Sequence, residues 1–271
     1  MRPELRQLLI AAGATLLLAA CSRPGTVKPP KIKGSEQIAP TYQLEDSAET
    51  KRRVQVREML ALAGQRFAGG DLDAAESQAR KVLRLDPAAA DANTLLGAIE
   101  GRRGRSEAAG PHYRRAAELA PERGDTLNNY GAWLCANGYP AEALVWFDRA
   151  LAAPGYATPG SALANAGGCA LKSGQGERAE RDLRRALEIE PRNPYALASM
   201  AEYQYGQGRY FEARAFAERR LAAAPADASV LQLAARIEDR LGDRVAASRY
   251  QQRLRAEFPQ AGPAITGENP Q

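Results

Sequence analysis

Few side chains in this sequence are of the kinds that carry out catalysis or hold a metal. The 271 residues include one histidine, His112, and three cysteines. His112 is followed by Arg114 and Arg115 and has no Cys, Asp or Ser in a recurrent catalytic context, so we interpret it as a surface or packing residue. A metal site needs clustered ligands, such as two cysteines three residues apart, and the sequence has no such cluster. We therefore expect a protein that is not an enzyme and that uses no metal and no cofactor.

The first cysteine, Cys21, stands at a candidate lipidation site. Two arginines precede an apolar run of thirteen residues, Leu8 to Ala20, which is too short to span a membrane and has the form of a secretory signal peptide. The run ends Leu-Ala-Ala-Cys, which resembles a bacterial lipobox. Residues 1–20 would then be removed, and acyl chains on Cys21 would anchor the protein, because each buried methylene contributes about 0.8 kcal/mol. An ordinary signal peptide that happens to contain a cysteine is the alternative.

Charge and composition exclude one class of partner and mark a linker. Without residues 1–20 the chain keeps 35 of its 37 basic and 31 of its 32 acidic residues, a formal charge of +4 spread along its length. Nucleic-acid binding normally shows a clustered basic stripe, so we expect no nucleic-acid partner. Residues 22–47 are rich in proline, glycine and lysine and poor in apolar side chains, so they cannot offset the entropy of ordering. We expect residues 21–50 to be the lipidated cysteine and a flexible tether.

Beyond the tether, three residue types recur at one period. A glycine recurs in steps of 34, 34, 36, 34 and 34 residues, an alanine follows each glycine by five residues, and a proline follows by seventeen in every copy except the third. The glycines are Gly70, Gly104, Gly138, Gly174, Gly208 and Gly242. In the third copy Gly155 takes the place of the proline, and Pro154 precedes it. Six copies in register are the helix-turn-helix pattern of the tetratricopeptide repeat.

Each recurring residue has a structural role that determines the architecture. The glycine ends a first helix with a left-handed turn, the small alanine lets the second helix lie close to the first, and the proline starts the next unit. Such helix pairs bury their apolar faces only against neighbouring pairs. We therefore predict an all-α fold, a right-handed α-solenoid of six tetratricopeptide repeats over residues 51–260. Its first helices line a concave surface, and residues 261–271 form a disordered tail.

The end of the solenoid leaves two interpretations open, because no polar capping helix follows the sixth repeat. In one, apolar side chains of that repeat are partly exposed: Leu231, Leu241 and Leu254. In the other, the sixth repeat caps itself with arginines: Arg236, Arg240 and Arg244.

Cys135 and Cys169 lie in the predicted first helices of repeats three and four. Adjacent first helices pack side by side, and an exported protein reaches an oxidising compartment, so we favour a disulfide between these cysteines. Two small buried thiols are the alternative. The cysteines stand two places apart in the repeat frame, and a bridge needs Cα atoms within about 7 Å.

Several phrases of the sequence resemble one protein family. They are Asn128 to Gly131 with Cys135, Glu142 to Leu144 with Phe147, the long turn at 153–156, and Ala162 to Gly167 with Cys169. Together with the lipobox and the repeat number, they resemble the type IV pilus biogenesis and stability lipoprotein family over most of residues 56–259. The resemblance implies a lipid-anchored outer-membrane protein that faces the periplasm. It also implies a pilotin, which supports the outer-membrane localisation and multimerisation of the secretin through which the pilus emerges.

Small residues at the centre of the predicted concave surface indicate where a partner binds. A groove of small residues bordered by amide and charged side chains accepts a partner helix or an extended segment, and the amides hydrogen-bond the partner's backbone. The predicted groove residues are Asn128, Asn129, Ala132, Asn165, Gly168, Lys172, Glu202 and Tyr205. In the alternative interpretation the small residues tighten the superhelix and the asparagines bridge adjacent repeats.

The leading functional hypothesis is a non-enzymatic pilotin that binds a secretin and takes no small-molecule substrate. A general periplasmic scaffold for cell-wall or outer-membrane assembly is the alternative. A hydrolase is a third hypothesis, for which the single histidine offers little.

Overall fold

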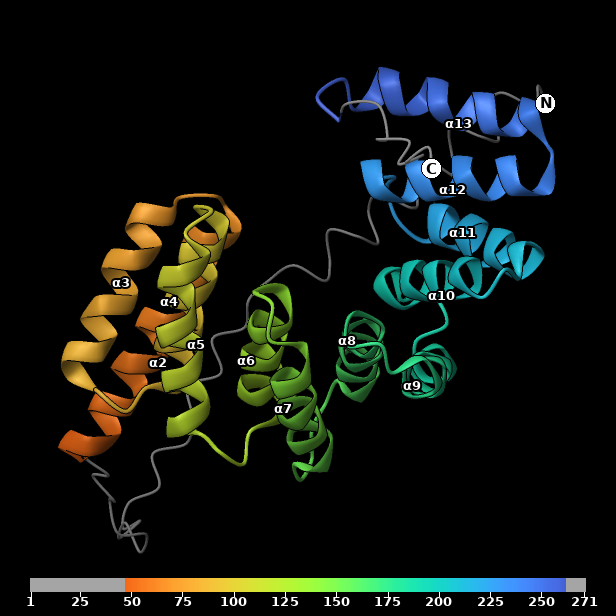
Figure 1. Ribbon diagram of the computed structural model, residues 1–271. Helices are drawn as coiled ribbons and strands as arrows, with labels where there is room; N and C mark the ends of the chain where they lie inside the picture. Colours follow the sequence, from red (N-terminus) through yellow and green to blue (C-terminus); the bar gives the residue numbers. More distant parts are fainter. Residues whose placement is uncertain (1–46, 262–271) are drawn as a thin grey trace, which may run out of the picture. The chain divides into compact units, whose positions relative to one another are not determined.

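The computed structural model describes residues 47–261, and within this range the chain forms twelve α-helices and no strand (Figure 1). The helices are α2 (Ala48–Ala68), α3 (Leu72–Leu85), α4 (Ala90–Arg102), α5 (Ser106–Leu119), α6 (Gly124–Ala136), α7 (Pro140–Ala152), α8 (Pro159–Lys172), α9 (Gly176–Ile189), α10 (Pro194–Gly206), α11 (Tyr210–Ala223), α12 (Ala228–Leu241) and α13 (Arg244–Glu257). The predicted signal peptide, Cys21, most of the tether and the tail from residue 262 lie outside the described residues.

The helices pack as six consecutive pairs, from α2 with α3 to α12 with α13, and each pair is one repeat (Figure 1). Each even-numbered helix also contacts the even-numbered helix of the next pair. These are the first helices of the repeats. The prediction of an all-α tetratricopeptide solenoid is therefore confirmed, because neighbouring pairs supply one another's buried surface.

The recurring glycines stand at the turns inside the pairs. All six have a left-handed backbone, with φ between 71° and 90°. After α4, the amide of Gly104 donates to the carbonyl of Gly101 at 3.0 Å, and the amide of Arg105 donates to the carbonyl of Glu100 at 2.9 Å. This pattern satisfies carbonyl groups that the helix end would leave without a donor.

Small residues let the two helices of a pair approach closely. The alanine of each copy is buried. A second small residue lies in the first helix of repeats two, three and four, where a Cβ added to the glycine would come within 2.9 Å or less of a large side chain of the second helix. The pairs are Gly97 with Tyr113, Gly131 with Phe147, and Gly167 with Leu183. Close packing of these pairs sets how the repeats stack.

The first helix starts earlier than the predicted domain boundary at residue 51. The α2 helix begins at Ala48 because the hydroxyl of Ser47 accepts a hydrogen bond from the amide of Thr50 at 3.1 Å, a standard N-cap. At 21 residues it is longer than the other described helices, which have 13 or 14. Three residues assigned to the tether, 48–50, therefore belong to the solenoid.

At the other end, the expected exposure of two leucines is wrong. Leu231 of α12 is fully buried and Leu254 of α13 is 8% exposed, whereas Leu241 is half-buried. The outward face of α13 is largely polar, with Arg249, Gln252 and Arg255 exposed. Of the three arginines expected to cap the repeat, Arg244 is exposed at the start of α13, while Arg236 and Arg240 do not form that cap. Their side chains lie over two tyrosine rings of repeat five.

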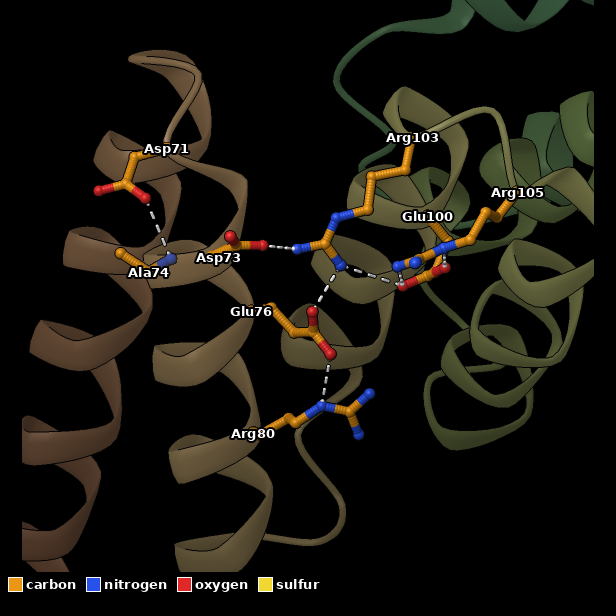
Figure 2. Close-up of polar contacts among 8 residues, drawn as sticks. All are labelled: Asp71, Asp73, Ala74, Glu76, Arg80, Glu100, Arg103 and Arg105. Atoms are coloured by element: carbon orange, nitrogen blue, oxygen red, sulfur yellow. Dashed lines mark hydrogen bonds and ion pairs between the residues drawn. The ribbon is translucent and has the colours of Figure 1, made fainter.

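Ion pairs connect the first two repeats at the turn between α4 and α5 (Figure 2). Arg103 reaches back to α3, where it pairs with Asp73 and, at 2.5 Å, with Glu76. Arg105 donates two hydrogen bonds to Glu100, at 2.5 and 2.7 Å. These hydrogen bonds to arginine hold the pKa of Glu76 and of Glu100 below the usual glutamate range.

Candidate functional site

The structure brings Cys135 of α6 and Cys169 of α8 together as a disulfide pair, with Cα atoms 5.9 Å apart. Both side chains are buried in the core around repeats three and four. The two cysteines stand two places apart when the repeats are aligned, but their side chains still meet because α6 and α8 lie against one another. The bridge joins the two repeats on either side of the lengthened turn.

That lengthened turn packs into the solenoid. Gly155 has φ of 67°, which turns the chain back so that Tyr156 lies against Gly124 at the start of α6. A Cβ on Gly124 would come within 2.5 Å of the tyrosine ring. Tyr156 therefore fills space beside α6, whereas Pro154 and Gly155 of the same turn are exposed.

Two of the predicted groove asparagines bind each other. The side-chain amide of Asn165 donates to the side-chain oxygen of Asn128 at 3.0 Å, across the contact between α6 and α8. Their amides are thus already paired, which is the bridging role of the alternative interpretation. Asn129 and Ala132 are half-buried on α6.

The groove of this surface lies further along the chain, beside α10. It has a volume of about 750 Å³ and is lined by residues from α8 to α12. Three predicted residues line it, namely Gly168, Lys172 and Glu202. The other predicted residues are not part of its lining: Asn128, Asn129, Ala132, Asn165 and Tyr205. The groove therefore lies on repeats four to six, about one repeat beyond the predicted centre of the binding surface.

The close approach of two helices shapes this groove. Tyr195 of α10 lies across Gly168 of α8, where an added Cβ would come within 2.4 Å of the tyrosine hydroxyl oxygen. Tyr195 is 43% exposed, so its ring forms part of the wall that a ligand would touch. Burial of the hydroxyl raises the pKa of Tyr195, which keeps it a neutral hydrogen-bonding group.

The charges of the groove differ between its two ends. Lys172 and Glu202 are exposed, and neither forms an ion pair with a described residue. Arg220 and Asp227 are paired at 2.7 Å. Arg220 is 8% exposed and also donates to the carbonyls of Ala224 and Pro225. The groove thus has one end fixed by a buried arginine and another with charges open to a partner.

Arg220 is not among the predicted groove residues, although its place in the repeat contains a signal for it. Arg220 stands in the column that holds Ala116, Ala150 and Ala186 in the three preceding copies. A buried arginine in an alanine column needs partners, and here they are the carbonyls and the carboxylate at the start of α12. The departure from the column marks the wall of the groove.

No described residues suggest a metal or catalytic centre. His112 is half-buried, and burial, followed by the charge of Arg80, lowers its pKa. No cluster of His, Cys, Asp and Glu that could hold a metal occurs within residues 47–261. In the same range, no helix combines the length and the apolar character needed to cross a membrane.

Residues 170–237, which include most of the groove, match the tetratricopeptide repeat family. Six stacked helix pairs with a groove on their first helices define the chain as a tetratricopeptide-repeat protein, a class of scaffolds that present extended binding surfaces.

Two relatives make the assignment more specific. The structure resembles that of PilW, described as a widely conserved type IV pilus biogenesis factor, with a TM-score of 0.68 and 30% identity over 75% of this chain and 94% of PilW. In sequence, the chain is 25% identical to the type IV pilus assembly protein PilF of Pseudomonas aeruginosa over 190 residues, which are 70% of this chain and 75% of PilF. The solved structure of PilF has the same fold, with a TM-score of 0.67. The chain belongs to the tetratricopeptide-repeat proteins of type IV pilus biogenesis.

Proposed function

We propose that this protein is a pilotin of type IV pilus biogenesis, a lipid-anchored outer-membrane protein that faces the periplasm, binds the secretin and supports its outer-membrane localisation and multimerisation. The observation that carries the proposal is the likeness to PilW, which extends over 94% of that chain. The relationship to PilF, a type IV pilus assembly protein, supports it. The tetratricopeptide scaffold fits a role in binding rather than in catalysis.

The groove beside α10 is the secretin-binding surface in this proposal. Its volume of about 750 Å³ is in the range of clefts that hold a ligand segment. Gly206 is exposed along its lining, while Lys172 and Glu202 present opposite charges. A segment of the secretin would lie along α10 and meet these charges with its own.

A deletion strain tests the function. We expect it to lose heat- and detergent-resistant secretin multimers from the outer membrane and to lose surface pili. Normal secretin multimers together with normal surface pili in the deletion strain would contradict the proposal. Loss of other envelope complexes with intact secretin multimers would favour the general periplasmic scaffold.

Charge reversal in the groove tests the binding surface. Lys172→Glu with Glu202→Lys, expressed in the deletion strain, should reduce secretin capture from detergent-solubilised membranes, since both side chains are exposed at the groove. Lys81→Glu with Glu188→Lys is the matched control, because both residues are exposed on second helices away from the groove. Equal capture by the two double variants would exclude this surface.

The lipid anchor is tested separately. Cys21→Ser removes the residue that would be acylated, so the protein should leave the outer-membrane fraction for the soluble periplasmic fraction. A variant that stays in the outer-membrane fraction would show that acyl chains are not what holds the protein there.

A further inference from the structure

Two tyrosines and two arginines of repeats five and six form a cluster, the arginine–tyrosine cluster of Tyr205, Tyr210, Arg236 and Arg240. The two tyrosine rings lie 5.5 Å apart between centroids. The guanidinium carbon of Arg236 lies 5.3 Å from the centroid of Tyr205, and that of Arg240 lies 5.8 Å from the centroid of Tyr210. A guanidinium over a ring is attracted by the ring face, and the N–H groups, which lie in the guanidinium plane, can still form hydrogen bonds.

Neither guanidinium of the cluster forms an ion pair with a carboxylate of residues 47–261. Neighbouring arginines of the same repeats do form such pairs, Arg214 with Glu238 and Arg220 with Asp227. Arg236 and Arg240 are both exposed and stand four residues apart on α12, where like charges repel. An external anion bound to both guanidinium groups would offset that repulsion. The lack of a carboxylate partner distinguishes these two arginines from the ion-paired arginines around them.

The cluster lies next to the groove on its α12 side, although none of its four residues is part of the lining. Glu202 and Gly206 of α10 line the groove, and Tyr205 lies between them in the sequence. The α10 and α12 helices contact each other, so the arginines of α12 stand beside this end of the groove. Lys172 stands at the α8 end. A segment lying along α10 therefore has one cation on its α8 side and two cations on its α12 side, with the exposed carboxylate of Glu202 on α10 between them.

We propose that the arginine–tyrosine cluster binds carboxylates of an acidic, extended segment of a partner protein whose neighbouring residues occupy the groove. Guanidinium groups form paired hydrogen bonds with carboxylates, which makes arginine suited to such recognition. The inference rests on the proposed function only for the identity of the partner.

The geometry also predicts the spacing of the acidic residues. Residues four apart on a helix are separated by about 6 Å along its axis. Alternate residues of an extended segment point to one side and are separated by about 6.6 Å. A segment with acidic residues at every second position therefore matches Arg236 and Arg240, whereas phosphates of a lipid surface have no such fixed spacing.

The test uses the purified protein and a short fluorescent peptide of alternating glutamate and alanine, followed by anisotropy at low salt. A peptide with glutamine in place of glutamate is the ligand control. Arg236→Gln with Arg240→Gln should weaken binding of the glutamate peptide by about tenfold or more, since hydrogen bonds to charged groups are lost. Arg249→Gln with Arg255→Gln removes the same charge from the exposed face of α13 and should leave binding within about twofold of the original.

Three outcomes separate the explanations, with circular dichroism verifying that each variant is folded. Equal binding of the glutamate peptide by the cluster variant, or equal binding of both peptides by the unaltered protein, would overturn the proposal. The cluster variant is also sedimented with phosphatidylglycerol vesicles. If the variant no longer sediments with the vesicles but still binds the glutamate peptide, the cluster binds lipid phosphates and the proposal is overturned. Loss of peptide binding with unchanged secretin capture would support the acid-binding site and count against the secretin as its ligand.

Discussion

At the scale of single residues, the glycines of this chain differ in whether helix packing requires them. Gly167 of α8 lies against Leu183, and an added Cβ would stand 2.5 Å from the leucine Cγ and 3.1 Å from its backbone nitrogen. Gly64 of α2 has nothing within 4 Å of the same position. One glycine is required by packing, while the other only weakens the helix that contains it.

Gly167→Ala should lower the free energy of unfolding by about 1–3 kcal/mol, because the new methyl group overpacks the contact with Leu183. Gly64→Ala should leave it unchanged or raise it by up to about 1 kcal/mol, because alanine favours the helix. Urea unfolding followed by circular dichroism measures both. Equal effects of the two substitutions would show that the close approach of α8 and α9 does not depend on Gly167.

The sequence predicted the turn glycines and the packing alanines well, because each recurs at the repeat period and each recurrence has one structural explanation. It predicted the polar residues of the groove only in part, since Lys172 and Glu202 line it but the predicted asparagines do not. One hydrogen bond links the side chains of Asn128 and Asn165, and whether it forms depends on how two helices are rotated against each other. Arg220 carried a readable signal, since it breaks a column of alanines, but its partners come from the next repeat.

At the scale of elements, corresponding turns of different repeats can be compared directly. In repeat two, Arg105 donates to the buried carboxylate of Glu100. In repeat five, the corresponding residues are Gln204 and Arg209, and there the Oε1 of Gln204 and the Nε of Arg209 are both buried without a hydrogen-bond partner. The side-chain hydrogen bonding at this turn is therefore complete in repeat two and incomplete in repeat five.

Gln204→Glu should complete the turn of repeat five and raise the free energy of unfolding by about 1 kcal/mol, through a charge-assisted hydrogen bond to Arg209. Glu100→Gln is the reciprocal change and should lower it by a similar amount. Chemical denaturation of both variants checks the pair. Destabilisation by Gln204→Glu would mean that burying the added carboxylate outweighs its new bond.

The ion pairs of the first two repeats predict a loss of stability in acid. Hydrogen bonds from arginines lower the pKa of Glu76 and of Glu100 in the folded chain. A carboxyl group whose pKa is lower in the folded chain than in the unfolded chain stabilises the fold at pH values above its unfolded pKa, which is about 4.3 for glutamate. This contribution disappears as the pH falls through the folded pKa. Melting temperatures measured from pH 7 down to pH 3 should therefore fall, and Glu76→Gln should flatten that fall. A slope identical to that of the unaltered protein would contradict the assignment.

At the scale of the whole molecule, the repeats depend on their neighbours, and the central two also have a covalent link. Each pair contacts only adjacent pairs within the described range, so stability should spread along the solenoid by nearest-neighbour packing. The bridge between Cys135 and Cys169 closes a loop of 34 residues across the lengthened turn. It restricts the unfolded chain in the middle of the solenoid.

Cys135→Ala with Cys169→Ala should lower the free energy of unfolding by about 2–4 kcal/mol, as expected for closing a loop of this length. Reductant should produce the same loss in the unaltered protein and none in the double variant, as measured by thermal unfolding. Two free thiols in the mass of the non-reduced protein would contradict the bridge.

The position of this bridge also determines how the protein responds to mechanical load. A chain pulled at its two ends transmits tension through Cys135 directly to Cys169, so the 34 residues of contour between them cannot be drawn out. At roughly 3.4 Å per residue, the bridge prevents about 110 Å of extension, which becomes possible when the bridge is reduced. Repeats one and two, and five and six, have no such link among the described residues, so under tension they would lengthen while the middle of the solenoid keeps its span.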